Sequence, residues 1–366
     1  QSAERRFDKA NADLKKTQLF TNRVMTFMPP LLMMLMNLLG VAIVWVASHR
    51  INTGNMQVGS MTAFLTYSMM IVMSFMILTV MSILIPRAGV AANRIDEVIS
   101  SKSSVIDRND AIDIEECSGR LEFDNVSFRY EGADAPALSG ICFTANPGET
   151  TAIVGSTGSG KSTIVNLIPR FFDVTAGCIK LDGRDIRDIS MKSLREKIGF
   201  VPQKGILFSG TIDSNIRFGN EAATPEEVRK AAEIAQALEF IEEKEDKFKS
   251  AIAQGGSNVS GGQKQRLSIA RAIAKNPKIL VFDDSFSALD MKTDAKLRRV
   301  LANYEKDATK IIVAQRVGTI IDAEQIIVLD EGEIVGKGRH RDLLRTCEAY
   351  RQIAESQLSK DELEVE

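Results

Sequence analysis

The sequence predicts an all-α transmembrane hairpin followed by an α/β domain built on a mainly parallel sheet. Two uncharged stretches, each long enough to cross a bilayer, lie before residue 100. Beyond them, short apolar runs alternate with helical patterns around a glycine-rich turn, as in parallel sheets with crossover helices. The largest helical pattern covers 225–243, and the alternation from Leu121 to Tyr130 slips once at Asp124 and Asn125, which predicts a strand with a bulge. A length of 366 residues fits two or three such units.

The predicted membrane spans cover about 24–48 and 58–86. A bilayer core needs roughly 20 apolar residues, so each stretch is long enough to cross it. Twelve of the fourteen methionines fall between Met25 and Met81, which sets this region apart from the rest of the chain. Basic residues flank the pair of spans more heavily than the turn between them, which places both ends in the cytoplasm. A buried helix of a soluble protein is the alternative for the first stretch.

Composition excludes several classes of protein. A formal net charge of −2 argues against a nucleic-acid partner that would be bound by bulk electrostatics. The cysteines show neither a C-x-x-C pair nor a neighbouring histidine cluster, so neither a zinc site nor a disulfide framework is indicated. They are Cys117, Cys142, Cys178 and Cys347. The chain begins with Gln1 rather than Met, and we expect a fragment of a longer protein.

The glycine-rich turn follows a β-branched run and matches the pattern G-x-x-x-x-G-K-S. Such a loop directs backbone N–H groups at phosphate oxygens from a helix N-terminus. Lys161 is expected to reach the β- and γ-phosphates, and the Ser162 hydroxyl to hold Mg²⁺. The expected nucleotide-binding residues here are Gly155, Ser156, Thr157, Gly158, Ser159, Gly160, Lys161, Ser162 and Thr163.

Two later segments carry compatible chemistry. An apolar strand, 279–282, ends in Asp283 and Asp284, and such a strand can deliver one acid to Mg²⁺ and the other to an attacking water. Further upstream, Ser260 precedes Gly261, Gly262 and Gln263, and a serine N-cap followed by two glycines predicts a second anion-binding helix start. One chain thus carries two phosphate-binding surfaces.

These segments resemble the nucleotide-binding domain of ABC transporters, and the hairpin resembles the last two helices of an ABC exporter subunit. The resemblance implies an ABC-type P-loop ATPase domain with a helical subdomain and an antiparallel β subdomain, using ATP and Mg²⁺. The expected boundaries are 1–99 for the C-terminal part of the transmembrane domain, 100–118 for a linker, 119–358 for the nucleotide-binding domain and 359–366 for an acidic tail.

The resemblance also assigns roles to single residues. Tyr130 is expected to stack on adenine, and Gln203 to contact both Mg²⁺ and water, so that Ser162, Gln203 and Asp283 form the metal site. Asp290 matches a loop that crosses the interface between two ATP-binding domains. In this family two such domains close head to tail, so 260–263 is expected to bind the partner's nucleotide.

Two positions depart from the family pattern. The family usually has Glu where this chain has Asp284, and His where it has Gln315. The shorter acid withdraws its carboxylate from the water, and an amide cannot become a cation against the γ-phosphate. The candidate catalytic residues are therefore Asp284, Gln315 and Gln203, at a site expected to hydrolyse ATP slowly.

The resulting prediction is an ATP-binding subunit of an exporter in the plasma (inner) membrane, with its nucleotide-binding domain in the cytoplasm. The favoured partner is a second, different exporter subunit, and the transported substrate is a hydrophobic small molecule, lipid or peptide. A homodimer with slow turnover and a mainly regulatory ATP-binding subunit are the alternatives. A soluble ATPase of the same superfamily is disfavoured by the two spans.

Overall fold

The chain forms two compact units, Gln1–Lys102 and Ser103–Glu366, in the computed structural model, which describes residues 2–101, 103–303 and 307–358. The predicted acidic tail, 359–366, lies outside the described residues. The predicted linker, 100–118, divides between the two units, and most of it belongs to the second. There Asp107 accepts hydrogen bonds from the buried Arg170 and from Met191 N, and Ile112 forms a parallel bridge with Ile189. This part of the linker is thus fixed to the second unit.

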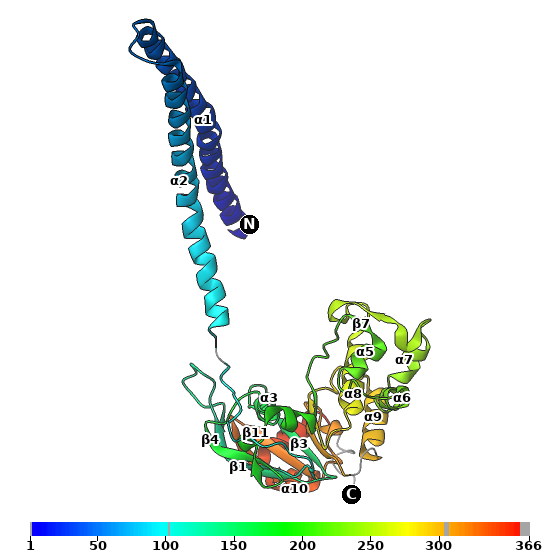
Figure 1. Ribbon diagram of the computed structural model, residues 1–366. Helices are drawn as coiled ribbons and strands as arrows, with labels where there is room; N and C mark the ends of the chain where they lie inside the picture. The colour runs from blue at the N-terminus through cyan, green and yellow to red at the C-terminus, as the bar shows by residue number, and fades with distance from the viewer. Residues whose placement is uncertain (1, 102, 304–306, 359–366) are drawn as a thin grey trace. The chain divides into compact units, whose positions relative to one another are not determined.

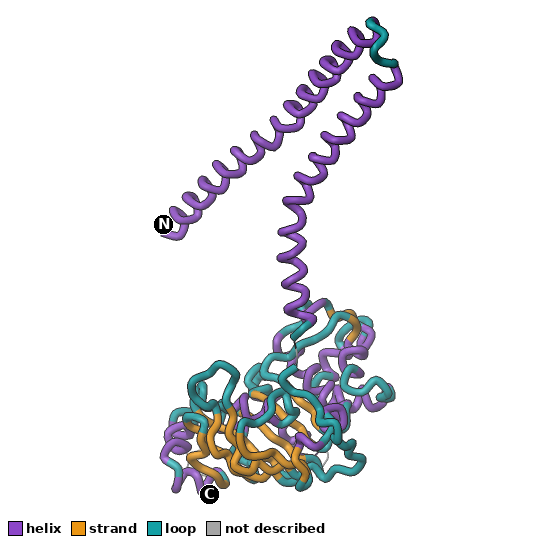
Figure 2. The backbone as a smooth tube through the Cα atoms, turned by 60° about the vertical axis from the view of Figure 1, so that its left-hand side comes forward, coloured by secondary structure: helices purple, strands orange, loops and turns teal. Residues whose placement is uncertain are grey.

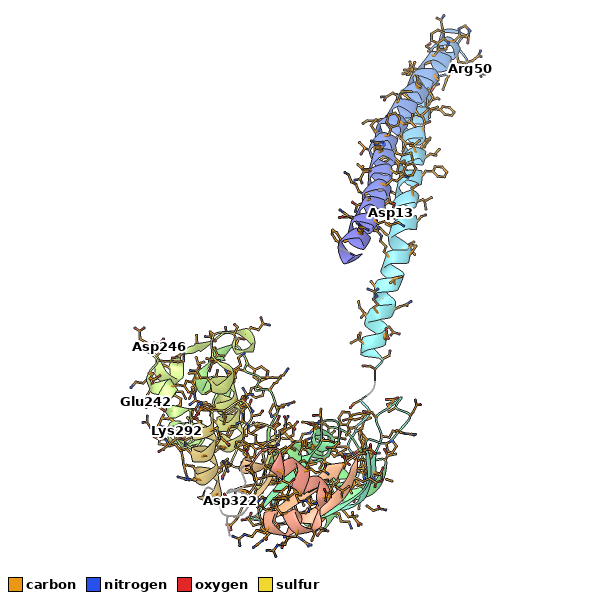
Figure 3. The ribbon with its side chains drawn as sticks, turned by 180° about the vertical axis from the view of Figure 1, so that it is seen from behind. Asp13, Arg50, Glu242, Asp246, Lys292 and Asp322 are labelled. Atoms are coloured by element: carbon orange, nitrogen blue, oxygen red, sulfur yellow. The ribbon has the colours of Figure 1, made fainter. Side chains whose placement is uncertain are left out.

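The first unit is a hairpin of two long helices, α1 (Ser2–Asn52) and α2 (Val58–Ile99), which run antiparallel in Figures 1 and 2. Each contains a window of high mean hydropathy, 2.2 in α1 and 2.4 in α2, with almost nothing buried inside the chain. Figure 3 shows Arg50 beside the turn and Asp13 toward the other end of the hairpin. Both predicted spans fall within these helices, whose exposed apolar surface suits a lipid environment.

The second unit is organised around a six-stranded sheet with the order β12-β11-β3-β10-β9-β6. Its four inner pairings, from β11 to β6, are parallel, and only the edge strand β12 pairs antiparallel. The predicted mainly parallel sheet is confirmed. Its strands are β3 (Thr150–Gly155), β6 (Ile198–Val201), β9 (Ile279–Asp283), β10 (Thr309–Val313), β11 (Gln325–Asp330) and β12 (Glu333–Gly338).

A second sheet of four antiparallel strands has the order β2-β1-β4-β5, and β7 pairs with β8 alone. The register of β1 slips between Phe123 and Val126, where the alternation of its sequence predicted a bulge. The bounds are β1 (Leu121–Phe128), β2 (Leu138–Ala145), β4 (Ala176–Leu181), β5 (Arg184–Asp185), β7 (Gly210–Thr211) and β8 (Ala251–Ile252).

The helices of this unit include a group in which α5, α6, α7 and α8 pack together, and α8 also contacts the sheet at β6. The sequence pattern predicts one helix over 225–243, and this is wrong: Gln236 adopts a left-handed φ of 56° and separates α6 from α7. The bounds are α3 (Lys161–Leu167), α4 (Met191–Glu196), α5 (Ile212–Arg217), α6 (Pro225–Ile234), α7 (Leu238–Glu242), α8 (Gly261–Ala274), α9 (Met291–Asn303), α10 (His340–Thr346) and α11 (Glu348–Glu355).

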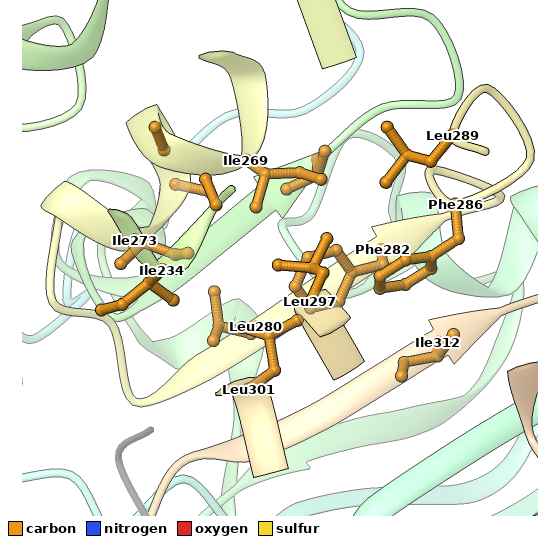
Figure 4. Close-up of a cluster of buried hydrophobic side chains, with 14 of the residues drawn as sticks. Ile234, Ile269, Ile273, Leu280, Phe282, Phe286, Leu289, Leu297, Leu301 and Ile312 are labelled. Carbon is orange, nitrogen blue, oxygen red and sulfur yellow. The ribbon is translucent and has the colours of Figure 1, made fainter. Parts of the chain in front are cut away.

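Both faces of the parallel sheet are covered. Along β9, Ile279 and Val281 join one core, whereas Leu280 and Phe282 join the other, and all four are fully buried. Figure 4 shows the second core, where Phe282 lies among side chains of α8 and α9. Burial on both faces explains why this strand is an unbroken apolar run rather than an alternating one.

Candidate active site

The phosphate loop leaves β3 at Gly155 and enters α3 at Lys161. A Cβ on Gly155 would lie 2.1 Å from Leu329 O of the neighbouring strand, so only glycine fits there. Gly160 has a left-handed φ of 97°, and its Cβ would lie 2.7 Å from a methyl group of Leu138. Close packing and positive φ thus fix two of the glycines that the pattern requires.

Lys161 lies over the loop. Its Nζ donates to Gly155 O at 2.8 Å and to Ser156 O at 2.6 Å. Burial lowers the pKa of Lys161, while the nearby carboxylates of Asp284 and Asp283 act in the opposite direction. The ammonium group is therefore held among carbonyl and carboxylate oxygens at the start of α3, where a phosphate chain can compete for it.

The next residue, Ser162, contacts the acid that ends β9. Its hydroxyl donates to Asp283 Oδ1 at 3.0 Å. Burial and the adjacent Asp284 raise the pKa of Asp283, against the effect of Ser162 and Lys161. Paired buried carboxylates disfavour ionisation unless a cation neutralises them, and hydroxyl and carboxylate oxygens are the donors that Mg²⁺ prefers. The residues present therefore fit a magnesium ion.

The sheet brings three predicted residues together, with Asp284 between the other two. Gln203 follows β6, Asp284 follows β9 and Gln315 follows β10, and these three strands are neighbours. Asp284 Oδ2 accepts from Gln203 Nε2 at 3.0 Å and from Gln315 Nε2 at 2.6 Å. The Asp284 side chain is 6% exposed and its φ is 48°. Both amides therefore hold one oxygen of one buried carboxylate.

Tyr130 lies beyond the end of β1, beside the start of α3. Its hydroxyl is 3.1 Å from Thr163 Oγ1, and Phe128 and Phe172 pack against the ring at near-perpendicular angles. The residue is 38% exposed. No motif marks Phe172, which lies between Phe171 and Asp173 in the chain. An aromatic ring held in this way, with part of its surface free, can stack on a base.

The segment Ser260–Gln263 forms the predicted N-cap, at the start of α8. Ser260 Oγ accepts from Gln263 N at 3.2 Å, and Gln263 Oε1 accepts from Ser260 N at 3.0 Å. Among the described residues, apart from its chain neighbours and the backbone of its own helix, no atom lies within 4 Å of the position that a Cβ on Gly261 would take. In the part of the chain that the structure describes, the side-chain hydrogen bonds of Ser260 and Gln263 stay within this box, so the segment is not joined to the phosphate loop by them.

Asp290 precedes α9 and acts locally as its N-cap. Its Oδ1 accepts from Thr293 N at 3.0 Å, and these hydrogen bonds lower the pKa of the carboxyl. The residue is exposed and makes none of the contacts among Asp283, Asp284 and Gln203. The predicted site residues thus form one cluster at the sheet and two surface segments, at the starts of α8 and α9.

Comparison with known proteins identifies both units. The ABC transporter family model matches residues 138–287, and the model of the ABC transporter transmembrane region matches residues 1–75. An uncharacterized ABC transporter ATP-binding protein of Mycobacterium bovis is 44% identical over 96% of this chain and 61% of its own length. An ATP-dependent lipid A-core flippase of Syntrophus aciditrophicus is 37% identical over 88% of this chain and 53% of its own.

Among solved structures, a bacterial Atm1-family ABC exporter with ATP bound superposes with a TM-score of 0.77 at 34% identity, over 89% of this chain and 57% of that one. The chain thus spans about three fifths of the length of these relatives. The predicted fold class is confirmed, as is the membrane location with a cytoplasmic ATPase domain. The chain belongs to the ABC transporter family and carries transmembrane helices and the ATP-binding domain of an exporter half-transporter.

Proposed function

We propose that this chain is the ATP-binding subunit of an ABC exporter whose own nucleotide site hydrolyses ATP slowly, and whose 260–263 segment completes the faster site of a different partner subunit. ATP binding and hydrolysis at the dimer interface would drive export of a hydrophobic or amphipathic substrate. The similarity to a lipid A-core flippase supports an amphipathic cargo. The apolar surface of α1 and α2, which is rich in methionine, also suits such a cargo.

Binding of MgATP rests on residues that are all present. Lys161 and the backbone of the phosphate loop would hold the phosphates, and Tyr130 would stack on the base. Ser162, Asp283 and Gln203 would hold Mg²⁺, which neutralises charge on the phosphates. Lys161 already lies within hydrogen-bonding distance of two loop carbonyls, so ligand binding requires only a local exchange of its partners.

Slow hydrolysis rests on one observation, the convergence of two amides on Asp284 Oδ2. With both amides on Oδ2, an attacking water would have to be oriented by the other oxygen, Oδ1, of an acid one methylene shorter than the family's usual Glu. Gln315 occupies the side of the site where a histidine could carry positive charge, and its amide stays neutral throughout. The geometry thus supports slow hydrolysis of an ATP molecule that the site can still bind.

The test is steady-state ATP hydrolysis by the full-length subunit, alone and with its candidate partner. A second complex carries the partner with its catalytic glutamate replaced by glutamine. We expect turnover only in the complex, and its loss with the partner's glutamate. Robust turnover by this subunit alone would replace the proposal with a homodimer in which Asp284 suffices.

A regulatory subunit is the second candidate, and the two departures at Asp284 and Gln315 favour it equally. The two proposals differ in one measurable respect. If 260–263 completes a partner's site, Ser260→Arg in this chain abolishes turnover of the complex. If this chain only senses ATP, that variant changes the response to ATP concentration and leaves the maximal rate within about twofold.

A further inference from the structure

The residue that braces the Gln315 loop lies just after α11. Gln357 lies two residues beyond the end of α11, and both atoms of its carboxamide bond the same loop. Its Nε2 donates to Gln315 O at 2.8 Å, and its Oε1 accepts from Val317 N at 2.8 Å. The side chain thus pairs with the backbone on both sides of Arg316, as a neighbouring strand would.

The loop needs this partner. After β10, Ala314 N still bonds Ile153 O at 3.2 Å, and the chain then turns into a short 3₁₀ helix, Val317–Thr319. The first N–H groups of a helix have no partner within it. Among the described residues, no backbone group bonds Gln315 O or Val317 N, and the Val317 residue is fully buried. Gln357 therefore satisfies the part-buried Val317 N, which would otherwise cost free energy, and also bonds the more exposed Gln315 O.

Gln357 is itself held by a packed helix. Tyr350 and Ala354 on α11 are fully buried, and the Tyr350 hydroxyl is 2.7 Å from Nδ1 of the buried His340. Leu358, the next residue after Gln357, packs against the same core, and its N–H bonds Ala354 O at 2.9 Å. The brace is thus anchored on both sides by the core beneath α11.

We propose that Gln357 is a positioning residue for Gln315, and that it ties α11 to the candidate active site. The brace fixes the backbone of Gln315, whose Nε2 then reaches Asp284 Oδ2 at 2.6 Å. That Gln357 fixes the backbone of this loop follows from its own hydrogen bonds. Its effect on turnover rests on the proposed function, in which the hydrogen bond from Gln315 to Asp284 limits hydrolysis.

Hydrogen exchange tests the brace without reference to activity. In the full-length subunit, Gln357→Ala should increase amide exchange in 314–320 by about fivefold, the loss expected for one part-buried hydrogen bond. The matched control is Gln352→Ala, because Gln352 lies on α11 and its side chain bonds Glu348, at 3.2 Å, and no other side chain or backbone group among the described residues. Unchanged exchange in Gln357→Ala, or an equal increase in the control, would overturn the brace.

A double-mutant cycle tests its effect on the site. Residual turnover of this chain's own site is measured with MgATP in a complex whose partner lacks its catalytic glutamate. Because the hydrogen bond from Gln315 to Asp284 limits hydrolysis in the proposed function, we expect Gln357→Ala to raise kcat about fivefold, with KM for MgATP within twofold, and to raise it no further when Gln315→Ala is already present. A merely structural role would lower kcat equally in both backgrounds.

The two readouts separate the possible failures. Faster exchange with unchanged kcat would keep the brace and overturn the role assigned to Gln315, whereas unchanged exchange would overturn the inference whatever the proposed function. If Gln357→Ala does not fold, Gln357→Glu serves instead, because it keeps the acceptor for Val317 N and loses the donor to Gln315 O. It should show the same changes at smaller size, and no change in either readout would refute the inference.

Discussion

Restoring the family pattern at the two departures should increase hydrolysis at this chain's own site. Asp284→Glu moves the carboxylate outward by one carbon–carbon bond, about 1.5 Å. A misplacement of about 1 Å costs about 100-fold in rate, or about 2.7 kcal/mol of transition-state stabilisation. Asp284→Glu combined with Gln315→His should therefore recover about 100-fold.

The single variants should recover much less than the double. Gln203 and Gln315 donate to Asp284 Oδ2 at 3.0 and 2.6 Å, so a longer acid meets amides that are placed for the shorter one. We expect Asp284→Glu alone to gain less than tenfold, which makes the two changes interdependent.

The assay is single-turnover hydrolysis of MgATP by the full-length complex, in which the partner's catalytic glutamate is glutamine. The remaining signal then belongs to this chain. Lys161→Ala added to the double variant is the control, since it should abolish the gain by removing phosphate binding. A double variant that stays within twofold of the parent would refute the reasoning and favour a purely regulatory site.

Three further predictions test other parts of the structure. Tyr130→Leu should raise the MgATP concentration for half-maximal binding by about tenfold, measured by equilibrium binding, because base stacking contributes about 1–3 kcal/mol; binding within twofold of the parent would contradict it. Arg170→Met should lower Tm in a thermal unfolding assay and lower the free energy of unfolding by about 2 kcal/mol or more, since this buried guanidinium bonds Asp107, Asp173 and the carbonyl of Ile106. An unchanged Tm would count against this prediction. Burial, and then Arg341, lower the pKa of His340, so stability should be full above its unfolded pKa of about 6.5 and fall as pH drops through the folded pKa. His340→Gln should flatten the dependence of Tm on pH between 7.5 and about 5, and an equal slope in both proteins would exclude the histidine.

The sequence predicts the parallel sheet well because its strands are chemically unambiguous. Residues 279–282 are apolar without interruption, which fits only a strand covered on both faces, and both cores indeed meet there. The bulge in β1 was also predictable, because Asp124 and Asn125 break an otherwise regular alternation. In both cases the side-chain pattern reports directly on burial.

The break between α6 and α7 was not predictable in the same way. Apolar and polar residues keep a helical spacing across it, and Gln236 is neither glycine nor proline. Its left-handed φ lets Ala237 N reach Ala232 O at 2.7 Å, which closes α6. The contacts of residues 103–118 were equally hidden, because the bond between Asp107 and Arg170 joins positions 63 apart in the chain.

In the candidate site too, some residues could be predicted from the sequence and others could not. Motifs identify Lys161, Ser162 and Asp283 because their spacing from glycines and from a buried strand is fixed by the chemistry of phosphate binding. No motif marks Gln357, which acts on Gln315 across 42 positions through a side chain that is common on protein surfaces. A residue that serves only to hold another leaves no local pattern in the sequence.

The structure changes how the two departures from the family pattern should be understood. From the sequence alone, Asp284 and Gln315 are two separate departures: one shortens the acid that the family usually has, and the other removes a side chain that could become a cation. In the structure they are direct partners, joined at 2.6 Å within a site where Asp284 is 6% exposed. Restoring Glu alone would crowd the amide, and restoring His alone would leave Asp284 with a different donor, so each change is costly without the other. Under the proposed function, their pairing would let the site keep every group that binds MgATP while Asp284 and Gln315 hold one another.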